Sequence, residues 1–295
     1  MARSDNLPET LLAPAPLRPD ELGDAQALVA EVGWNQTERD WRMFLDLGHV
    51  QAVRTDTGGV IATAATLPYG GFGWISMVLV TAAWRRRGLA SQLLRDAIND
   101  LRGAGIVPVL DATPAGREVY RKLGFVDTWG FARLARPAVS AARDPDPGGH
   151  DDIDVQPITD AMWSVICAYD ATTFGSDRGR LLAGLRGRMP PAALVALRGD
   201  RLVGFLLGRE GRIATQLGPL IAEDAITARA LLGRVLAAVT SPVFIDLADS
   251  KPETRAFVEA QGFAFTRPLT RMVYGRADAF DDGVRTFAVV GPEFG

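Results

Sequence analysis

Three consecutive arginines and a glycine stand where a strand-like run gives way to a helical one. Arg85, Arg86, Arg87 and Gly88 follow shortly after an apolar run that ends at Val80. Glycine lets the backbone approach a ligand, the first N–H groups of a helix point outward, and the helix dipole favours negative charge there. The arginines add charge-assisted donors. These residues predict a cradle for a pyrophosphate, and a solvated basic helix start is the simpler alternative for the same sequence.

The elements that position this cradle are a buried strand before it and an amphipathic helix after it. Residues 74–80 are apolar almost throughout, as a buried strand requires. Apolar residues recur at helical spacing over residues 87–101, and Gly103 and Gly105 predict the end of that helix. The first half as a whole is predicted to contain helices at 21–32, 37–47, 87–101 and 114–123 and strands at 50–54, 60–67, 74–80, 106–110 and 131–136.

The second half repeats this order of elements. It is predicted to contain helices at 160–169, 225–239 and 252–261 and strands at 194–198, 202–209, 214–221 and 243–247. Shifting one half on the other by 138 positions superposes Leu94 on Leu232, Gly124 on Gly262, Phe125 on Phe263 and Arg133 on Arg271. Because strands occur in runs with helices between only some of them, we expect an α/β fold of the mixed-sheet, α+β kind, in two tandem domains.

A stretch rich in Asp, Pro and Gly separates the two copies and shows no periodicity. We therefore expect a first domain over residues 1–137, a linker over 138–154, a second domain over 155–275 and a tail over 276–295. Within the tail, residues 285–295 are typical of one more strand with a turn. This last strand would pack across the domains.

Composition excludes several classes of protein. The net charge of −3, from 32 basic and 35 acidic residues, favours neither nucleic acid nor an anionic membrane as a partner. One cysteine and two histidines cannot build a cysteine-rich zinc site or a histidine-rich metal cage, so we expect no metal. No stretch approaches the roughly 20 apolar residues of a membrane span. We expect a cytoplasmic monomer or homodimer.

Two separated motifs resemble the GCN5-related N-acetyltransferase (GNAT) family. They are R-x-x-G-x-A at residues 85–90, directly after an apolar strand, and V-Y-R-K-L-G-F at residues 119–125. The runs G-W-N-Q at 33–36, W-I-S-M-V-L-V at 74–80 and L-D-A-T-P-A-G at 110–116 are similar to bacterial members with two such domains in tandem. The resemblance implies two mixed, mostly antiparallel sheets flanked by helices, and acetyl-CoA as cosubstrate.

The resemblance also implies where acetyl-CoA would bind. The backbone of residues 78–80 would pair with the pantetheine arm like an added strand. The pyrophosphate would rest on the N–H groups of residues 86–90. Thr113 and Gly116 occupy positions where the family often has Asn and Ala, so a cofactor contact from Thr113 is an open expectation. The implied cofactor-binding residues are Val78, Leu79, Val80, Arg85, Arg86, Arg87, Gly88, Leu89, Ala90, Ser91, Thr113 and Gly116.

Catalytic roles follow from the same resemblance. Tyr120 would be the general acid that protonates the departing thiolate, and a core aromatic is the alternative reading of that residue. The backbone N–H of Leu79 would stabilise the oxyanion. Asp111 is a candidate base, although an Asp shortly before Thr-Pro is more typical of a cap or a structural residue.

The acceptor site is expected beside the first two predicted helices. Trp34, Trp41 and Glu31 are candidate lining residues, and tryptophans at helical spacing are also typical of a core. A small amine, an amino acid, an antibiotic and a protein lysine all fit the expectation. The acidic residues of this region slightly favour a cationic acceptor.

The second copy departs from the family pattern at the residues that carry chemistry. The shift of 138 places Glu223 at the position of Arg85, Ile226 at that of Gly88 and Val258 at that of Tyr120. We therefore expect an N-acetyltransferase that acts by direct attack in a ternary complex, with catalysis in the first domain. The alternative is a non-catalytic acyl-CoA sensor or assembly module on the same scaffold.

Overall fold

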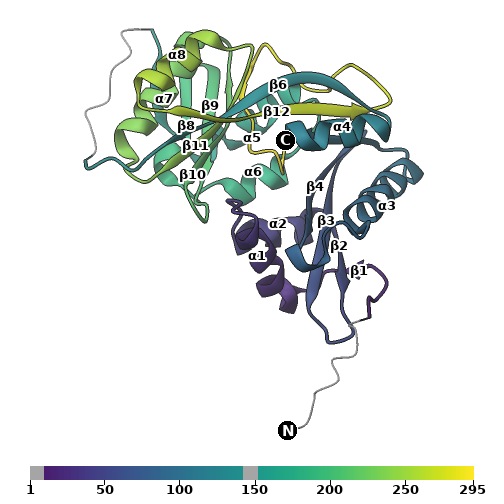
Figure 1. The fold of residues 1–295 in the computed structure, drawn as a ribbon. Helices are drawn as coiled ribbons and strands as arrows, with labels where there is room; N and C mark the ends of the chain where they lie inside the picture. Colours follow the sequence, from purple (N-terminus) through teal and green to yellow (C-terminus); the bar gives the residue numbers. More distant parts are fainter. Residues whose placement is uncertain (1–9, 142–151) are drawn as a thin grey trace.

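The computed structural model describes residues 10–141 and 152–295 (Figure 1). The strands are β1 (Ala15–Pro16), β2 (His49–Arg54), β3 (Val60–Tyr69), β4 (Phe72–Val80), β5 (Val107–Ala112), β6 (Phe125–Arg136), β7 (Asp154–Pro157), β8 (Leu194–Arg198), β9 (Arg201–Arg209), β10 (Thr215–Ala222), β11 (Val243–Ala248), β12 (Ala264–Tyr274) and β13 (Thr286–Ala288). The α-helices are α1 (Leu22–Glu31), α2 (Glu38–Leu47), α3 (Leu89–Gly103), α4 (Pro114–Lys122), α5 (Trp163–Phe174), α6 (Gly179–Leu185), α7 (Ala225–Ala238) and α8 (Pro252–Ala260).

The strands join in one mixed sheet whose order is β1-β2-β3-β4-β5-β12-β6-β11-β13-β10-β9-β8-β7. Most neighbouring pairs are antiparallel, while β4–β5 and β10–β11 are parallel. Helices flank the sheet in both halves, as the sequence predicts. Strand β6 begins at Phe125 instead of residue 131, and the helix α6 and the strands β1, β7 and β12 are not among the predicted elements.

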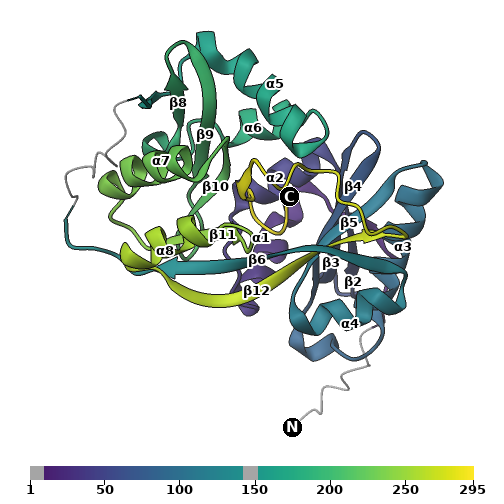
Figure 2. The same ribbon diagram turned by 90° about the horizontal axis from the view of Figure 1, so that it is seen from above.

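The last strands of the two halves are exchanged. Strand β12, from the second half, pairs with β5 of the first half, and β6 pairs with β11 of the second. The two long strands also pair with each other, and Figure 2 shows them side by side between the halves. A division at residue 137 therefore separates two sequence repeats but not two sheets, and the domain limits remain predictions. The predicted linker lies mostly outside the described residues.

Strands β4 and β5 separate partway along their length. They pair in parallel only from Phe72 to Trp74 on β4 and from Val107 to Val109 on β5. Pro108, which has no N–H to donate, lies in this short pairing. Beyond it β5 pairs with β12, and β4 continues along β3 to Val80. A gap in the backbone ladder therefore opens between β4 and β5.

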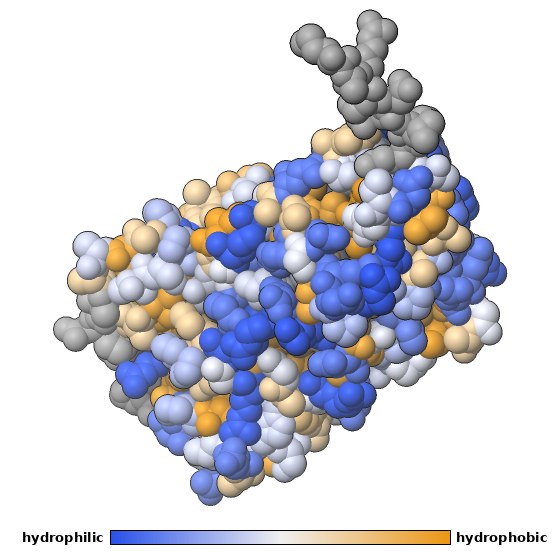
Figure 3. Space-filling view, turned by 90° about the horizontal axis from the view of Figure 1, so that it is seen from below, coloured by the Kyte–Doolittle hydropathy of each residue, from blue (hydrophilic) through white to orange (hydrophobic). Residues whose placement is uncertain are grey.

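One large hydrophobic cluster is shared by the two halves. Trp41 and Phe44 of α2 pack in the same cluster as Phe174 of α5 and Phe294, and the rings of Phe44 and Phe294 stack at 4.8 Å. Such shared packing orients the halves as one body. The face in Figure 3 shows apolar residues in small separate groups among polar ones. Among the described residues, no helix is long and apolar enough to cross a membrane.

Candidate active site

A cavity of about 270 Å³ lies at the gap between β4 and β5. Five of the predicted site residues line it: Trp34, Val78, Asp111, Thr113 and Tyr120. The second half and the tail supply the opposite wall through Arg267, Leu269, Pro292 and Glu293. The exchanged strand β12 brings Arg267 and Leu269 to the first half, and the tail adds Pro292 and Glu293, so the cavity belongs to both repeats.

The predicted acceptor residues do not all meet at this cavity. Trp41 is fully buried in the shared core and packs edge-on against Phe44, with ring centroids 6.0 Å apart. The prediction that Trp41 lines the acceptor pocket is therefore wrong, because its ring packs in the core. Glu31 also lies elsewhere, since its carboxylate accepts hydrogen bonds from Thr81 Oγ1 at 2.7 Å and the Ala82 N–H at 2.5 Å.

The loop before α3 has the geometry of an anion cradle. Arg86 and Gly88 adopt positive φ angles of 63° and 85°, and α3 begins directly afterwards at Leu89. A Cβ added at Gly88 would meet no atom within 4 Å, so the space beside it is open. Arg85 is held by Glu31 at 3.0 Å and by the Val80 carbonyl at 3.0 Å. Glu31 therefore fixes the base of this loop and does not line the acceptor cavity.

The ring of Tyr120 projects from α4 into the cavity. Among the described residues its hydroxyl has no hydrogen-bond partner, and burial raises the pKa of the phenol. A Cβ at Gly116 would lie 2.9 Å from the ring, so glycine leaves the room that Tyr120 occupies. Thr113 caps the same helix, since its hydroxyl accepts from the Gly116 N–H at 3.3 Å. The phenol is thus protonated, unpartnered and sterically fixed.

Asp127 of β6 ties α4 to the sheet through Arg117 and Arg121. These hydrogen bonds lower the pKa of Asp127 to about 2, and the bond from Arg117 has the largest effect. The ionised pair therefore stabilises the fold above pH ~4 and loses this effect as the pH falls towards 2. We expect Asp127→Asn to cost about 1 kcal/mol at neutral pH, after discounting for solvent screening, and almost nothing below pH ~2. Urea unfolding across this pH range measures the difference. Asp56→Asn, at an exposed turn, is the matched control, and a constant loss in Asp127→Asn would contradict the assignment.

A bulge in β4 decides which backbone amides face the cavity. Leu79 lies opposite Thr63 and Thr81 donates to the Ile61 carbonyl at 2.9 Å, so the alternation of the ladder turns the Leu79 N–H towards β3. The register then shifts by one residue at Met77, whose φ is 51°. The Leu79 side chain is also buried in the core. The expected oxyanion role does not fit Leu79, and the outward-facing amide at the bulge is that of Val78.

Asp111 is bound on both oxygens by one guanidinium. Arg271 of β12 donates to Oδ1 and Oδ2 at 3.0 Å each, and donates to Asp281 at 2.8 Å. Its guanidinium also lies over the rings of Trp74 and Trp129, at 4.4 and 4.5 Å. Burial raises the pKa of Asp111 to about 6, against the opposing charge of Arg271. This geometry fits the structural reading of Asp111 and not that of a base.

Sequence reasoning missed four polar groups at the cavity. Ser76 Oγ, Gln36 Oε1, Glu293 Oε2 and Arg267 Nε are buried without a hydrogen-bond partner among the described residues. Buried polar atoms are normally paired, so a set of unpaired ones in a cavity indicates a polar ligand. Gln36 belongs to the G-W-N-Q run and could have been singled out there. No local signal marks Arg267 or Glu293.

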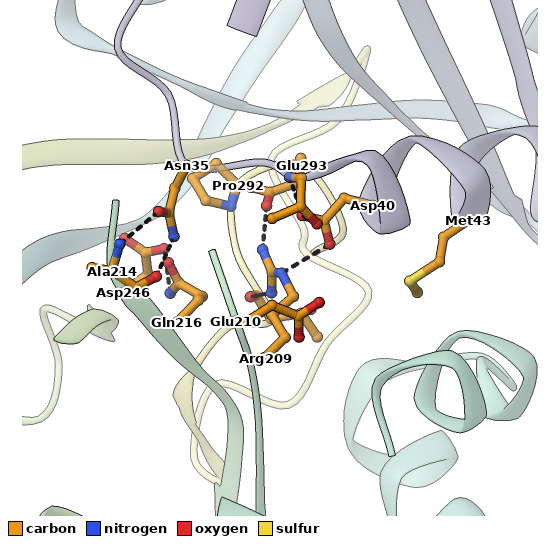
Figure 4. A network of polar contacts seen from close by, with 12 residues as sticks. Asn35, Asp40, Met43, Arg209, Glu210, Ala214, Gln216, Asp246, Pro292 and Glu293 are labelled. Carbon is orange, nitrogen blue, oxygen red and sulfur yellow. Dashed lines mark hydrogen bonds and ion pairs between the residues drawn. The ribbon is translucent and has the colours of Figure 1, made fainter. Parts of the chain in front are cut away.

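A polar network fixes the cavity wall (Figure 4). Arg209 donates to Glu293 and to the Val290 carbonyl, and also pairs with the buried Asp40 at 3.2 Å. Asn35 bonds the backbone of Ala214 in both directions, at 2.9 and 3.0 Å. These contacts tie the loop between α1 and α2 and the tail to the second half.

The corresponding region of the second half is filled. Strand β13 lies between β10 and β11, pairing with both through Ala288. Glu223 is paired with Arg201, and Val258 is fully buried. No open gap equivalent to that between β4 and β5 therefore exists within the described part of this half.

Comparisons with known proteins agree with this geometry. Residues 20–125 match the Acetyltransferase (GNAT) family, and residues 166–287 match an Acetyltransferase (GNAT) domain. An uncharacterized N-acetyltransferase, YitH of Bacillus subtilis, is 21% identical over 75% of this chain and 76% of its own. A putative acetyltransferase from Pyrococcus horikoshii superposes with a TM-score of 0.76 at 17% identity, over 100% of this chain and 99% of that one. A tandem GNAT protein from the clavulanic acid biosynthesis pathway gives 0.61 at 14% identity, over 91% and 100%.

Proposed function

The chain belongs to the GNAT acetyltransferases and carries two GNAT domains in tandem, and we propose that its first domain transfers the acetyl group of acetyl-CoA to an amine. One observation carries the proposal. The cavity at the gap between β4 and β5 is lined by Val78 of β4 and Tyr120 of α4, and β4 is followed in the chain by the open cradle at Gly88. Such a gap suits a thioester laid between two strands, with its phosphates at a helix start and its carbonyl in the cavity.

The residues present fit acetyl-CoA as the cosubstrate. The backbone of residues 78–80 offers donors and acceptors to the pantetheine amides, with Val78 and Val80 directed into the gap. The amides of residues 86–90 and the guanidinium groups of the three arginines would hold the pyrophosphate. The glycine φ and the open space at Gly88 are what a close phosphate requires.

The reaction needs two proton transfers and one oxyanion donor. A neutral amine attacks the thioester carbonyl, a C–N bond forms, and the Val78 N–H stabilises the oxyanion. The C–S bond then breaks, its electron pair stays on sulfur, and Tyr120 gives the sulfur a proton. The amide nitrogen releases a proton that restores the phenol. We propose direct attack in a ternary complex, and the absence of a cysteine among the described residues that line the cavity supports it over a thioester intermediate on the protein.

Catalysis is assigned to the first domain because the described residues of the second domain offer no open gap between strands, no basic cradle and no acid at the position of Tyr120. The second-half gap is filled by β13, a carboxylate stands where the cradle needs positive charge, and a buried valine replaces the acid. The second domain instead supplies one wall of the cavity. We propose that it shapes the acceptor site of the first.

Gly88→Val is expected to raise the Kd for acetyl-CoA at least about tenfold, because a β-branched residue disfavours the positive φ and fills the cradle. Calorimetric titration measures this. Gly105→Val is the matched control, since Gly105 also has a positive φ of 74° and open space but lies away from the cradle. Equal loss in both variants would mean that only folding is affected.

The function itself is tested by measuring acetyl-CoA consumption by the full chain against a panel of amines. We expect amine-dependent release of free thiol. Failure to bind acetyl-CoA would overturn the proposal. Binding without turnover across the whole panel would favour the non-catalytic acyl-CoA sensor instead.

A further inference from the structure

The cavity wall contributed by the second half and the tail carries a carboxylate with one unpartnered oxygen, on Glu293, and a guanidinium without an ion pair among the described residues, on Arg267. Glu293 is 4% exposed, and Arg209 occupies only its Oε1. Its Oε2 is buried, has no partner among the described residues and belongs to a side chain that lines the cavity. A buried carboxylate oxygen without a partner can accept a hydrogen bond from a cationic donor of a ligand.

Arg267 supplies the opposite charge. It lies directly across from Arg133 in the β6–β12 ladder, and both side chains line the cavity. Arg133 is neutralised by Asp246, at 2.7 Å, whereas Arg267 has no ion pair within residues 10–141 and 152–295. Burial and the positive charge of Arg133 lower the pKa of Arg267. A partly buried guanidinium without a counter-ion is a site for an anion.

Glu293 and Arg267 line the same cavity, and among the described residues they form no ion pair with each other. A ligand in this cavity that carries both charges would therefore find a partner for each. We propose that the acceptor is a small zwitterion of the amino-acid class, with its ammonium group at Glu293 and its carboxylate at Arg267. This inference rests on the proposed acetyltransferase function and names its substrate class. Ser76 and Gln36 would bind further polar atoms of the same molecule.

The placement also supplies the base that the first half lacks. The ammonium group gives one proton to Glu293 Oε2, and the neutral amine that results can attack the thioester. The proton on Glu293 then passes to solvent, while Tyr120 protonates the departing sulfur. The sum is an ammonium group and a thioester giving an amide, a free thiol and one released proton. Glu293 is thus both the recognition residue and the base.

The experiment uses matched probes on the full chain, with and without coenzyme A. Each of the twenty amino acids is titrated by calorimetry beside its amine lacking the carboxylate and its acid lacking the amine. We expect at least one amino acid to bind about tenfold or more tighter than either truncated form, as two charge-assisted contacts require. Aminoalkylphosphonates distinguish a carboxylate from a phosphate-type anion. Equal binding by the amine alone, or no binding by any amino acid, overturns the inference.

Two variants assign the charges. Arg267→Gln should abolish the tighter binding of the amino acid over the amine that lacks the carboxylate. Glu293→Gln should abolish the tighter binding of the amino acid over the acid that lacks the amine. The controls are Arg255→Gln and Glu259→Gln, which pair with each other on the surface of α8. An unchanged preference in Arg267→Gln overturns the inference. If amino acids bind but acetyl-CoA is not turned over, the proposed acetyltransferase function is wrong and the zwitterion site stands. If simple amines are acetylated at a rate that Arg267→Gln does not change, the function stands and the zwitterion site is wrong.

Discussion

Replacing Tyr120 by phenylalanine is expected to lower kcat by about a hundredfold to ten-thousandfold, with little change in the Kd for acetyl-CoA. The substitution removes only the hydroxyl, so the ring keeps its place against Gly116 and Phe125. The lost group is the unpartnered proton donor of the cavity, and general acids contribute about this much to the rate. Steady-state kinetics with free-thiol detection, beside a binding titration, separates the two effects.

Tyr274→Phe is the matched control for this prediction. Tyr274 also packs on Phe125, but its hydroxyl accepts from Arg102 at 3.3 Å on the other side and does not line the cavity. We expect its turnover to equal that of the wild type. Undiminished turnover in Tyr120→Phe would remove the proposed acid and return Tyr120 to a packing role.

The largest loss of stability is expected from Arg271→Met. Arg271 is 2% exposed and neutralises both Asp111 and Asp281, which are equally buried. Removing one partner of a buried ion pair typically costs about 3–5 kcal/mol, because the remaining carboxylates keep no counter-charge. We expect a loss of this size in the free energy of unfolding, measured with denaturant.

The pH dependence and a surface control sharpen this test. Burial already raises the pKa of Asp111 above its unfolded value, and without the opposing charge of Arg271 the pKa rises further, so the variant loses more stability as the pH rises. The loss in Arg271→Met should therefore be smaller in acid than in alkali. Arg276→Met, whose partner Asp278 lies 3.6 Å away at the surface, should cost less than about 1 kcal/mol. A similar small cost for both variants would show that the buried cluster is not a major source of stability.

Much of the fold follows from short stretches of sequence. The buried strand over 74–80, the helix after Gly88 and the helix that begins at Pro114 each depend on a local pattern, and each is present. The sequence also predicts the repeat and the loss of functional residues from its second copy, since Glu223 and Val258 stand where the first copy has Arg85 and Tyr120. Positive φ at Gly88 and the cap at Thr113 agree with the turn and cap chemistry of their residue types.

The exchange of β6 with β12 could not be predicted in this way. The local pattern predicts only residues 131–136 of β6 and no strand over residues 264–274, so it cannot choose between β5 and β11 as the partner. The choice depends on contacts between residues far apart in sequence, such as Asp111 with Arg271. The same long-range pairing makes Asp111 a structural residue and places Trp41 in a shared core.

The sequence by itself determined the family scaffold, the cradle and the position of Tyr120, because each is encoded by neighbouring residues whose backbone and side-chain preferences act locally. Only the tertiary structure decided what surrounds the reacting atoms. The bulge at Met77 turns the Val78 amide outward in place of that of Leu79, and strand exchange carries Arg267 and the tail with Glu293 to a cavity of the first half. Register and strand order are set by the packing of the whole sheet, and no single stretch of residues contains that information.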